Sequence, residues 1–295
     1  MAFIGNQQIQ TTTTRTYHVY VPDNPIAAQL PAIIVFHGGG QDVATIAQRW
    51  GVDPPNPVPQ LVENYILVFP ESDPNLGGRW MHFKLGGALP EHDLLFVDEL
   101  LAEITTAGVF PTPSGQAVNA DPERIYAAGF SNGGGMVWQI AYSDPARIAQ
   151  FSGFATVGKA LDPEKIDRYR SIHGAPPASP VIYIHGTGDT TFTPPRTLNE
   201  VPIDTTYPAN TVREMLLRNN VPAGPSATQL IAGSANATEV VAQLYAGTEA
   251  FSNVTIINGG HNWPTPTTAG NPPVAQHINA TQMIVEFWQT YAGLP

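Results

Sequence analysis

Gly129-Phe130-Ser131-Asn132-Gly133 is the stretch of sequence that decides the fold. The apolar run 124–128 before it predicts a buried strand, and the run 134–141 after it predicts a helix. A serine at such a strand-to-helix turn is forced into a strained backbone conformation, and only glycines avoid a steric collision on either side of it. The pattern therefore predicts a serine whose hydroxyl stands out at the carboxyl end of a sheet.

Short apolar runs alternate with helical spacing along the rest of the chain. Strands are expected at 15–21, 31–36, 65–70, 124–128, 154–157, 180–185 and 254–257, and helices at 92–104, 134–141, 211–218 and 276–291. Asp93 is expected to cap the first of these helices. The alternation predicts a mostly parallel sheet covered by helices on both faces. With the serine turn, it predicts a single α/β-hydrolase domain over residues 1–295.

Two stretches interrupt this pattern. Residues 54–59 are rich in proline, and residues 190–210 are polar and directly follow a predicted strand. Both are expected to be excursions within one domain, because no repeat, charge block or long linker separates them from the rest. The second excursion is placed to shape a pocket.

The composition excludes several classes of function. The 295 residues carry 13 Lys and Arg against 24 Asp and Glu, a net charge of −11, so neither nucleic acid nor an acidic membrane surface is expected as a partner. There is no cysteine, which excludes disulfides, thiolate catalysis and cysteine-ligated metals. No metal-ligand spacing or dinucleotide fingerprint occurs, so no metal or cofactor is expected. Neither a signal peptide nor a run of about 18 apolar residues is found in the sequence.

A serine hydroxyl is a poor nucleophile unless a histidine takes its proton and a carboxylate orients that histidine. In α/β-hydrolases the order is serine, acid, histidine, with each residue just past a strand. His261 is the best candidate for the base, because it follows a predicted strand and a glycine pair. Asp189 is the best candidate for the acid, because it follows strand 180–185. Asp162 and Asp204 also fall in the allowed interval, but neither follows a convincing strand.

Other histidines are weaker candidates for the base. His18 lies within a predicted strand and precedes the serine, His173 falls in a Gly/Pro loop, and His277 falls in the last predicted helix. His37 and His185 are expected to brace loops through hydrogen bonds rather than to react.

Acyl transfer also needs N–H donors for the oxyanion of the tetrahedral intermediate. The residue after the nucleophile, Asn132, is expected to supply one from its backbone. The loop His37-Gly38-Gly39-Gly40-Gln41 follows an early strand and is placed to supply the second. The sequence favours Gly39 or Gly40 and does not decide between them.

Three aromatic residues fall next to these motifs. Phe130 lies inside the serine turn, Trp263 follows the histidine, and Trp80 follows a glycine pair beyond the third strand. Aromatic side chains beside a catalytic centre can form an acyl or aryl pocket, so all three are candidate substrate-binding residues. Ordinary core packing is the alternative role for these aromatic residues, and for Trp80 the sequence supports the two roles equally.

Four segments of the chain, 37–41, 120–134, 185–189 and 259–264, resemble the motifs of the polyhydroxybutyrate depolymerase and feruloyl esterase group. The resemblance implies that Ser131, Asp189 and His261 form the catalytic triad. It also implies a secreted or periplasmic enzyme that acts on hydroxycinnamoyl esters of plant polysaccharide or on polyesters.

The chain departs from that group in two respects. Many members carry disulfides, and extracellular depolymerases often carry a linker and a surface-binding domain, neither of which is found in this sequence. Smaller soluble esters are therefore favoured over solid polymer. The sequence predicts a serine carboxylic-ester hydrolase, first of feruloyl type, with a hydroxyalkanoate oligomer or polyester depolymerase or a short-chain esterase as alternatives. A non-catalytic carbohydrate- or polymer-binding protein on the same scaffold and a prolyl-type peptidase are the rivals from other classes.

Overall fold

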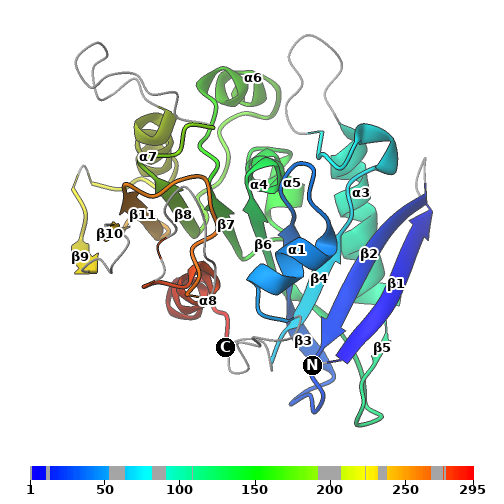
Figure 1. The fold of residues 1–295 in the computed structure, drawn as a ribbon. Coiled ribbons are helices and arrows are strands. Elements are labelled where there is room, and N and C mark those ends of the chain that lie inside the picture. Colours follow the sequence, from blue (N-terminus) through cyan, green and yellow to red (C-terminus); the bar gives the residue numbers. More distant parts are fainter. Residues whose placement is uncertain are drawn as a thin grey trace. The chain divides into compact units, whose positions relative to one another are not determined.

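The computed structural model describes residues 2–10, 14–52, 64–81, 91–107, 109–191, 207–222, 224–231, 238–266, 275 and 277–295 (Figure 1). The chain forms two compact units. The first unit comprises Met1–Ile140, Ala149–Ser152 and Leu294, and the second comprises Ala141–Ile148, Gly153–Gly293 and Pro295. A single domain over residues 1–295 stays a prediction, and each unit is described by itself.

The strands of the first unit run in the order β1-β2-β4-β3-β6. Their bounds are β1 Ala2–Gln10, β2 Thr14–Val21, β4 Ile66–Pro70, β3 Gln29–Phe36 and β6 Ala117–Phe130, and a short β5, Phe110–Pro111, pairs with β6. β3 is parallel to both β4 and β6, whereas β1 and β2 add to the edge in antiparallel pairing. Every residue of β4 is buried, as expected of a parallel strand covered on both faces.

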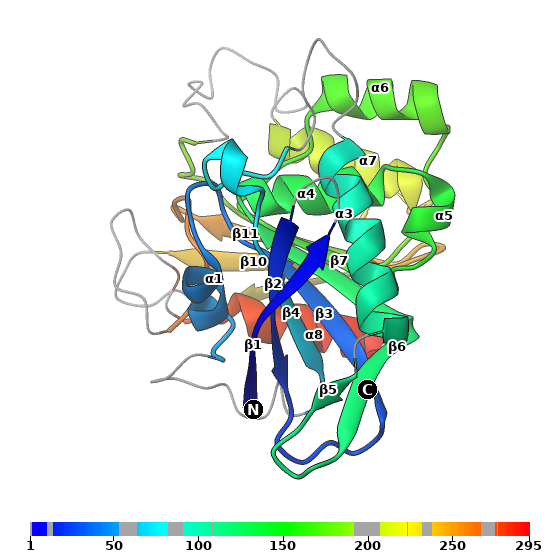
Figure 2. The same ribbon diagram turned by 90° about the vertical axis from the view of Figure 1, so that its right-hand side faces the viewer.

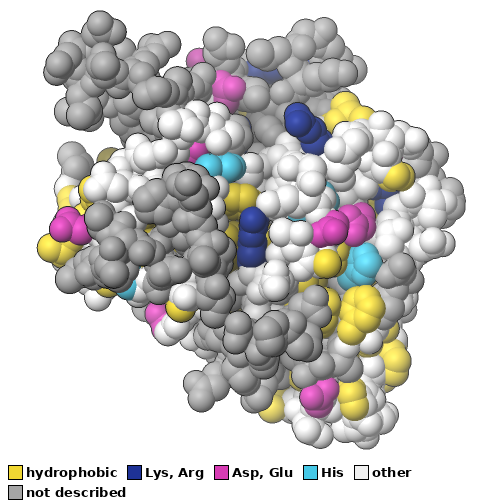
Figure 3. Space-filling model, in the orientation of Figure 1, with side chains coloured by type: hydrophobic (Ala, Val, Ile, Leu, Met, Phe, Trp, Pro, Cys, Tyr) yellow, Lys and Arg dark blue, Asp and Glu magenta, His cyan; other side chains and the backbone are white. Residues whose placement is uncertain are grey.

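The edge strands are more exposed. Residues of β2 alternate between buried and partly exposed, so one face of this strand packs on the core. Hydrophobic side chains gather on the outer surface over β1 and β2 (Figure 3). Phe3 there is 52% exposed, and its ring stacks on that of His18.

Helices cover the strands of the first unit on both sides. They are α1 (Val43–Arg49), the 3₁₀ helix η1 (Pro74–Leu76), α3 (Glu91–Ala102), the π-helical turn η2 (Glu103–Ala107) and α4 (Asn132–Ala141), which ends at the boundary of the second unit. Figure 2 shows α1 and α3 on opposite sides of β2, β3 and β4. Asp42 caps α1, because its Oδ1 accepts the N–H of Thr45 at 2.9 Å.

The predicted cap of α3 was wrong. The helix begins at Glu91, so Asp93 lies within its first turn, and the Asp93 side chain is completely buried. Its Oδ1 lies 2.9 Å from Nη2 of Arg15, whose side chain is also completely buried. A carboxylate near the start of a helix usually indicates a cap. The side chain of Asp93 is instead held by a buried ion pair with Arg15 of β2.

The second unit repeats the pattern with a parallel centre and an antiparallel edge. Its strand order is β7-β8-β11-β10-β9, with β7 Gly153–Val157, β8 Val181–Gly186, β11 Phe251–Ile257, β10 Glu239–Tyr245 and β9 Ala227–Ile231. The pairs β7–β8 and β8–β11 are parallel, and β10 pairs antiparallel with β11 and β9. The helices are α5 (Pro145–Ile148), α6 (Pro163–His173), α7 (Tyr207–Arg218) and α8 (Ala280–Tyr291). α8 packs on β7 and β8, and α7 packs on β11.

The predicted core strands and the helix at 211–218 are confirmed, but two histidines are placed differently. His173 is the last residue of α6 rather than part of a loop, and His277 precedes α8, which begins at Ala280. The proline-rich stretch 54–59 and residues 192–206 of the second excursion lie outside the described residues. In the part of the chain that the structure describes, no helix combines the length and apolar character that a membrane span requires.

Candidate active site

The serine turn lies where β6 ends and α4 begins. Ser131 has a φ of 54°, in the left-handed region that residues with a side chain rarely adopt. Its carbonyl accepts the N–H of Gly135 at 3.0 Å, the first hydrogen bond of α4. A Cβ on Gly129 would lie 2.3 Å from the carbonyl oxygen of Gly133, and one on Gly133 would lie 2.1 Å from that of Phe36. The predicted steric need for both glycines is therefore confirmed.

The parallel pairing of β3 and β6 brings the loop 37–41 to the serine turn. Phe36, the last residue of β3, pairs in register with Gly129, so both segments leave the sheet at the same level. The loop closes by a turn in which Gln41 N–H donates to the Gly38 carbonyl at 3.1 Å. The Gln41 side chain in turn accepts the N–H of Gly38 at 3.2 Å.

The hydrogen bonds of this loop distinguish its two candidate donors. Gly40 N–H donates to the carbonyl of Gly78 at 2.8 Å, so this N–H already has an acceptor. The N–H of Gly39 has no acceptor among the residues that the structure describes. A Cβ on Gly39 would lie 3.3 Å from Cβ of Asn132, which places Gly39 directly beside the residue that follows the serine. As the first residue of α4, Asn132 also has no intrahelical acceptor for its N–H.

His37 braces the start of this loop, as predicted. Its Nδ1 donates to the carbonyl of Gly38 at 2.8 Å, and its Nε2 accepts the N–H of Ser72 at 3.2 Å. A ring that donates at one nitrogen and accepts at the other is neutral. Burial lowers the pKa of His37 and so favours this neutral form.

The three candidate substrate-binding rings are all buried. Trp80 is 3% exposed, donates its indole N–H to the carbonyl of His37 at 3.0 Å, and packs edge-on against Phe36. Phe130 is 3% exposed and lies under the guanidinium of Arg49, whose carbon is 4.4 Å from the ring centre. Trp263, in the second unit, is 1% exposed. Contact of these rings with a substrate stays a prediction.

The acid and the histidine come together in the second unit. His261 Nδ1 lies 2.7 Å from Oδ2 of Asp189, and Oδ1 of Asp189 accepts the N–H of Thr191 at 2.9 Å. Because a carboxylate only accepts hydrogen bonds, Nδ1 carries the proton and Nε2 of the neutral imidazole carries a lone pair. The pair thus has the arrangement of a base oriented by an acid. The other candidate acid in the described chain, Asp162, stands at the cap position of α6, whereas Asp204 lies outside the described residues.

Backbone contacts fix the two loops that carry this pair. Gly186 and Ile256 pair in register on the parallel strands β8 and β11, so the loops leave the sheet together. A Cβ on Gly186 would lie 2.1 Å from the carbonyl oxygen of Gly259. That same carbonyl accepts the N–H of Gly188 at 2.8 Å, and Thr187 Oγ1 accepts the N–H of Asn258 at 2.9 Å. The relative position of acid and histidine is therefore set by close backbone approach.

His185, at the end of β8, contacts the neighbouring strand β11, as expected of a bracing residue. Its Nε2 lies 3.1 Å from Oγ1 of Thr255, and its ring stacks on that of Tyr183. Burial lowers the pKa of His185 to about 4, so the ring is neutral at pH 7. Across the described ranges of the chain, no group of three or more His, Asp or Glu side chains is arranged to hold a metal ion.

Comparison with known proteins shows the fold. Neither protein-family models nor curated protein sequences give a match to this chain. An acetyl xylan esterase from Aspergillus awamori is similar in structure, with 16% identity, a TM-score of 0.52, and coverage of 87% of this chain and 94% of its own. A poly(3-hydroxybutyrate) depolymerase from Bordetella parapertussis matches with 16% identity, a TM-score of 0.50, and coverage of 93% and 83%.

A feruloyl esterase module from Clostridium thermocellum, in complex with sinapinate, matches with 13% identity, a TM-score of 0.50, and coverage of 89% and 82%. Some similar chains are longer: this chain spans 51% of a thermostable esterase, at 18% identity and a TM-score of 0.46. The likenesses to the acetyl xylan esterase, the depolymerase and the feruloyl esterase module confirm the predicted α/β-hydrolase fold.

Proposed function

We propose that this protein is a serine carboxylic-ester hydrolase that works through an acyl-enzyme. The conformation of Ser131 is the observation that carries the proposal, because a serine at φ 54° between two glycines that tolerate no Cβ is held in place at an energetic cost. Fold alone does not determine function. The proposal therefore rests on this serine turn and on the Asp189–His261 pair, each described within its own unit.

In the proposed mechanism, Ser131 Oγ attacks the carbonyl carbon of the ester while Nε2 of His261 takes the hydroxyl proton. The proton then passes to the leaving alcohol, and water repeats the sequence on the acyl-enzyme to release the acid. Asp189 holds the Nδ1 proton of His261 and stabilises the imidazolium that forms. The N–H groups of Asn132 and Gly39 would receive the oxyanion. We choose Gly39 over Gly40 because the N–H of Gly40 is already bonded to Gly78.

Covalent labelling and one substitution test the reaction class. A fluorophosphonate should modify the protein once, on the peptide that contains Ser131. Ser131→Ala should abolish the labelling and lower kcat for an aryl acetate by ~10³-fold or more. Ser171→Ala, which changes an exposed serine of α6, is the matched control and should behave as wild type. Turnover retained in Ser131→Ala would refute the proposal.

For the substrate we propose a feruloyl-type ester first. The resemblance of the motifs to those of feruloyl esterases supports this choice, and so does the structural similarity to a feruloyl esterase module that binds sinapinate. A short-chain acyl or hydroxyalkanoate ester is the second candidate. The burial of Trp80, Phe130 and Trp263 favours it, since rings already packed against protein have little surface left for an aryl group.

Relative kcat/KM values for methyl ferulate, an aryl acetate and a hydroxybutyrate oligomer distinguish these candidates. A preference of more than ~100-fold for the aryl acetate over methyl ferulate corresponds to a barrier difference of ~2.7 kcal/mol. That result would exclude an aromatic acyl pocket and leave a short-chain esterase.

A further inference from the structure

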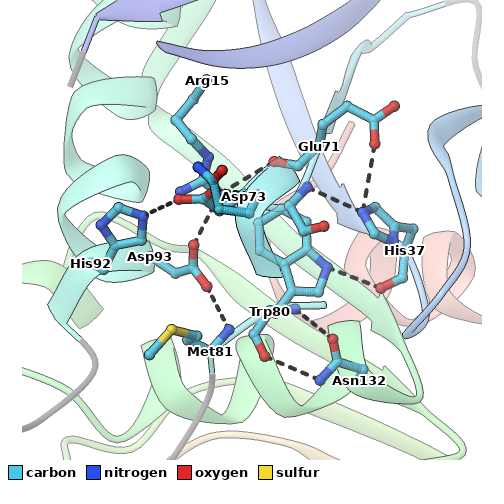
Figure 4. A network of polar contacts seen from close by, with 11 residues as sticks. Arg15, His37, Glu71, Asp73, Trp80, Met81, His92, Asp93 and Asn132 are labelled. Atoms are coloured by element: carbon cyan, nitrogen blue, oxygen red, sulfur yellow. Dashed lines mark hydrogen bonds and ion pairs between the residues drawn. The ribbon is translucent and has the colours of Figure 1, made fainter. Parts of the chain in front are cut away.

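The segment 77–81 lies against the loop 37–41 and is tied to the serine turn by one side chain (Figure 4). Oδ1 of Asn132 accepts the N–H of Trp80 at 2.6 Å, and Nδ2 of Asn132 donates to the carbonyl of Trp80 at 3.2 Å. A single carboxamide thus satisfies both backbone groups of one residue in another segment. Such a pair fixes orientation as well as distance, because both bonds must hold at once.

The same segment is bonded to both ends of the loop. The carbonyl of Gly78 accepts the N–H of Gly40 at 2.8 Å, and the indole N–H of Trp80 donates to the carbonyl of His37 at 3.0 Å. The Trp80 ring packs edge-on against Phe36 with a centroid distance of 5.1 Å, at the end of the strand that leads into the loop. Movement of the segment would therefore move the loop.

A buried ion pair holds the far end of the segment. The N–H of Met81 donates to Oδ2 of Asp93 at 2.6 Å, and Oδ1 of Asp93 pairs with Arg15 at 2.9 Å. The guanidinium of Arg15 lies 4.1 Å from the centre of the Phe96 ring. Both charged side chains are completely buried, so this anchor belongs to the core of the first unit.

We propose that the side chain of Asn132 is a positioning group for oxyanion stabilisation. It holds segment 77–81, which engages Gly40 and His37 and thereby leaves the N–H of Gly39 in the position that receives the developing charge. The backbone N–H of the same residue is the first donor, so Asn132 sets the geometry of both donors. This inference rests on the proposed ester hydrolysis.

The chemistry of the contact requires a carboxamide. Aspartate accepts the N–H of Trp80 but has no proton for its carbonyl, and alanine does neither. Both substitutions keep the backbone N–H at position 132. They therefore remove the positioning contact without removing the first donor.

The test compares Asn132→Ala and Asn132→Asp with wild type in aryl acetate hydrolysis. Removal of one oxyanion donor lowers kcat by ~10²–10³-fold, so a displaced donor is expected to lower it by about 10- to 100-fold. KM should change by less than about twofold, because the charge to be stabilised exists only in the transition state. An arylboronic acid forms a tetrahedral, anionic adduct with the serine, and its Kd should rise in parallel with the fall in kcat.

Asn119→Ala is the matched control, since it removes a carboxamide bond to the carbonyl of Thr105 elsewhere in the first unit and should leave kcat and boronate affinity unchanged. A wild-type kcat in Asn132→Ala overturns the inference, and so does a fall in kcat without a loss of boronate affinity. If Asn132→Ala fails to fold, the Asn132→Asp variant decides by the same criteria. Absence of both turnover and fluorophosphonate labelling in the wild type would instead overturn the proposed function, and this inference with it.

Discussion

Gly186→Ala tests whether backbone packing alone sets the geometry of the acid–histidine pair. A Cβ at this position would lie 2.1 Å from the Gly259 carbonyl oxygen and 2.9 Å from that of Gly260. Ordinary contact begins at 3.4 Å, so the loops after β8 and β11 must separate by about 1.3 Å. The obstructing atoms are backbone, so no side-chain rotation relieves the collision.

The displacement predicts the size of the effect. A misplacement of about 1 Å in a catalytic constellation can lower the rate by about 10²-fold. Separation of the loops stretches the 2.7 Å contact between His261 and Asp189, so kcat for an aryl acetate should fall by at least ~100-fold. Overpacking of a well-packed site also destabilises the fold, typically by about 1–3 kcal/mol.

Three measurements make the test specific. Steady-state kinetics give kcat, urea unfolding gives the free energy of unfolding, and proton NMR detects the deshielded Nδ1 proton of His261 that a short bond to a carboxylate produces. Gly224→Ala is the matched control, because a Cβ there meets no atom within 4 Å. A Gly186→Ala protein that keeps kcat within about threefold of wild type and retains the Nδ1 resonance would refute the reasoning.

Two further predictions concern stability. Asp93→Ala removes a carboxylate that is paired with the buried guanidinium of Arg15 and should lower the free energy of unfolding by about 3–5 kcal/mol, measured with urea; a loss below about 1 kcal/mol would show that the pair is not structural. Burial lowers the pKa of His185 from 6.5 to about 4. Between these pH values the unfolded chain binds a proton that the folded chain does not, so the free energy of unfolding decreases as the pH falls through that range. His185→Gln should therefore lose less stability than wild type between pH 7 and pH 5, and equal losses would contradict the assignment.

The sequence predicted the features that depend on local pattern. Strands at 31–36, 65–70 and 180–185 are continuous apolar runs, which a strand covered on both faces requires. The strain at Ser131 was also predictable, because the flanking glycines indicate a steric constraint that arises within a few residues of the turn. The sequence predicted that Asp189 and His261 act together, because of their order along the chain and because each follows a strand. In the structure the two side chains are in contact.

Features set by distant partners were not predictable. Asp93 was taken for a helix cap because its partner, Arg15, lies on another element far away in the sequence. The choice between Gly39 and Gly40 depends on a carbonyl of the segment 77–81. The role of the Asn132 carboxamide depends on the same segment, and the only signal in the sequence was its place after the serine.

Edge strands were missed for a different reason. β9 consists of mostly exposed residues, and β10 is only partly buried, so neither has the apolar run that marks a core strand. Their structure comes from pairing with a neighbouring strand, β10 with β11 and β9 with β10, which a local pattern does not reveal.

The left-handed conformation of Ser131 bears on how this chain can evolve. Strain of this kind is of order 1–3 kcal/mol, a sizeable part of a typical net stability of about 5–15 kcal/mol. Glycine adopts the same conformation without that penalty. A lineage that had ceased to need the hydroxyl would therefore gain robustness by replacing this serine with glycine, and under the proposed function selection for turnover would oppose the exchange. Among descendants of this sequence, the residue at position 131 would then distinguish active enzymes from proteins that keep the fold but have lost the activity.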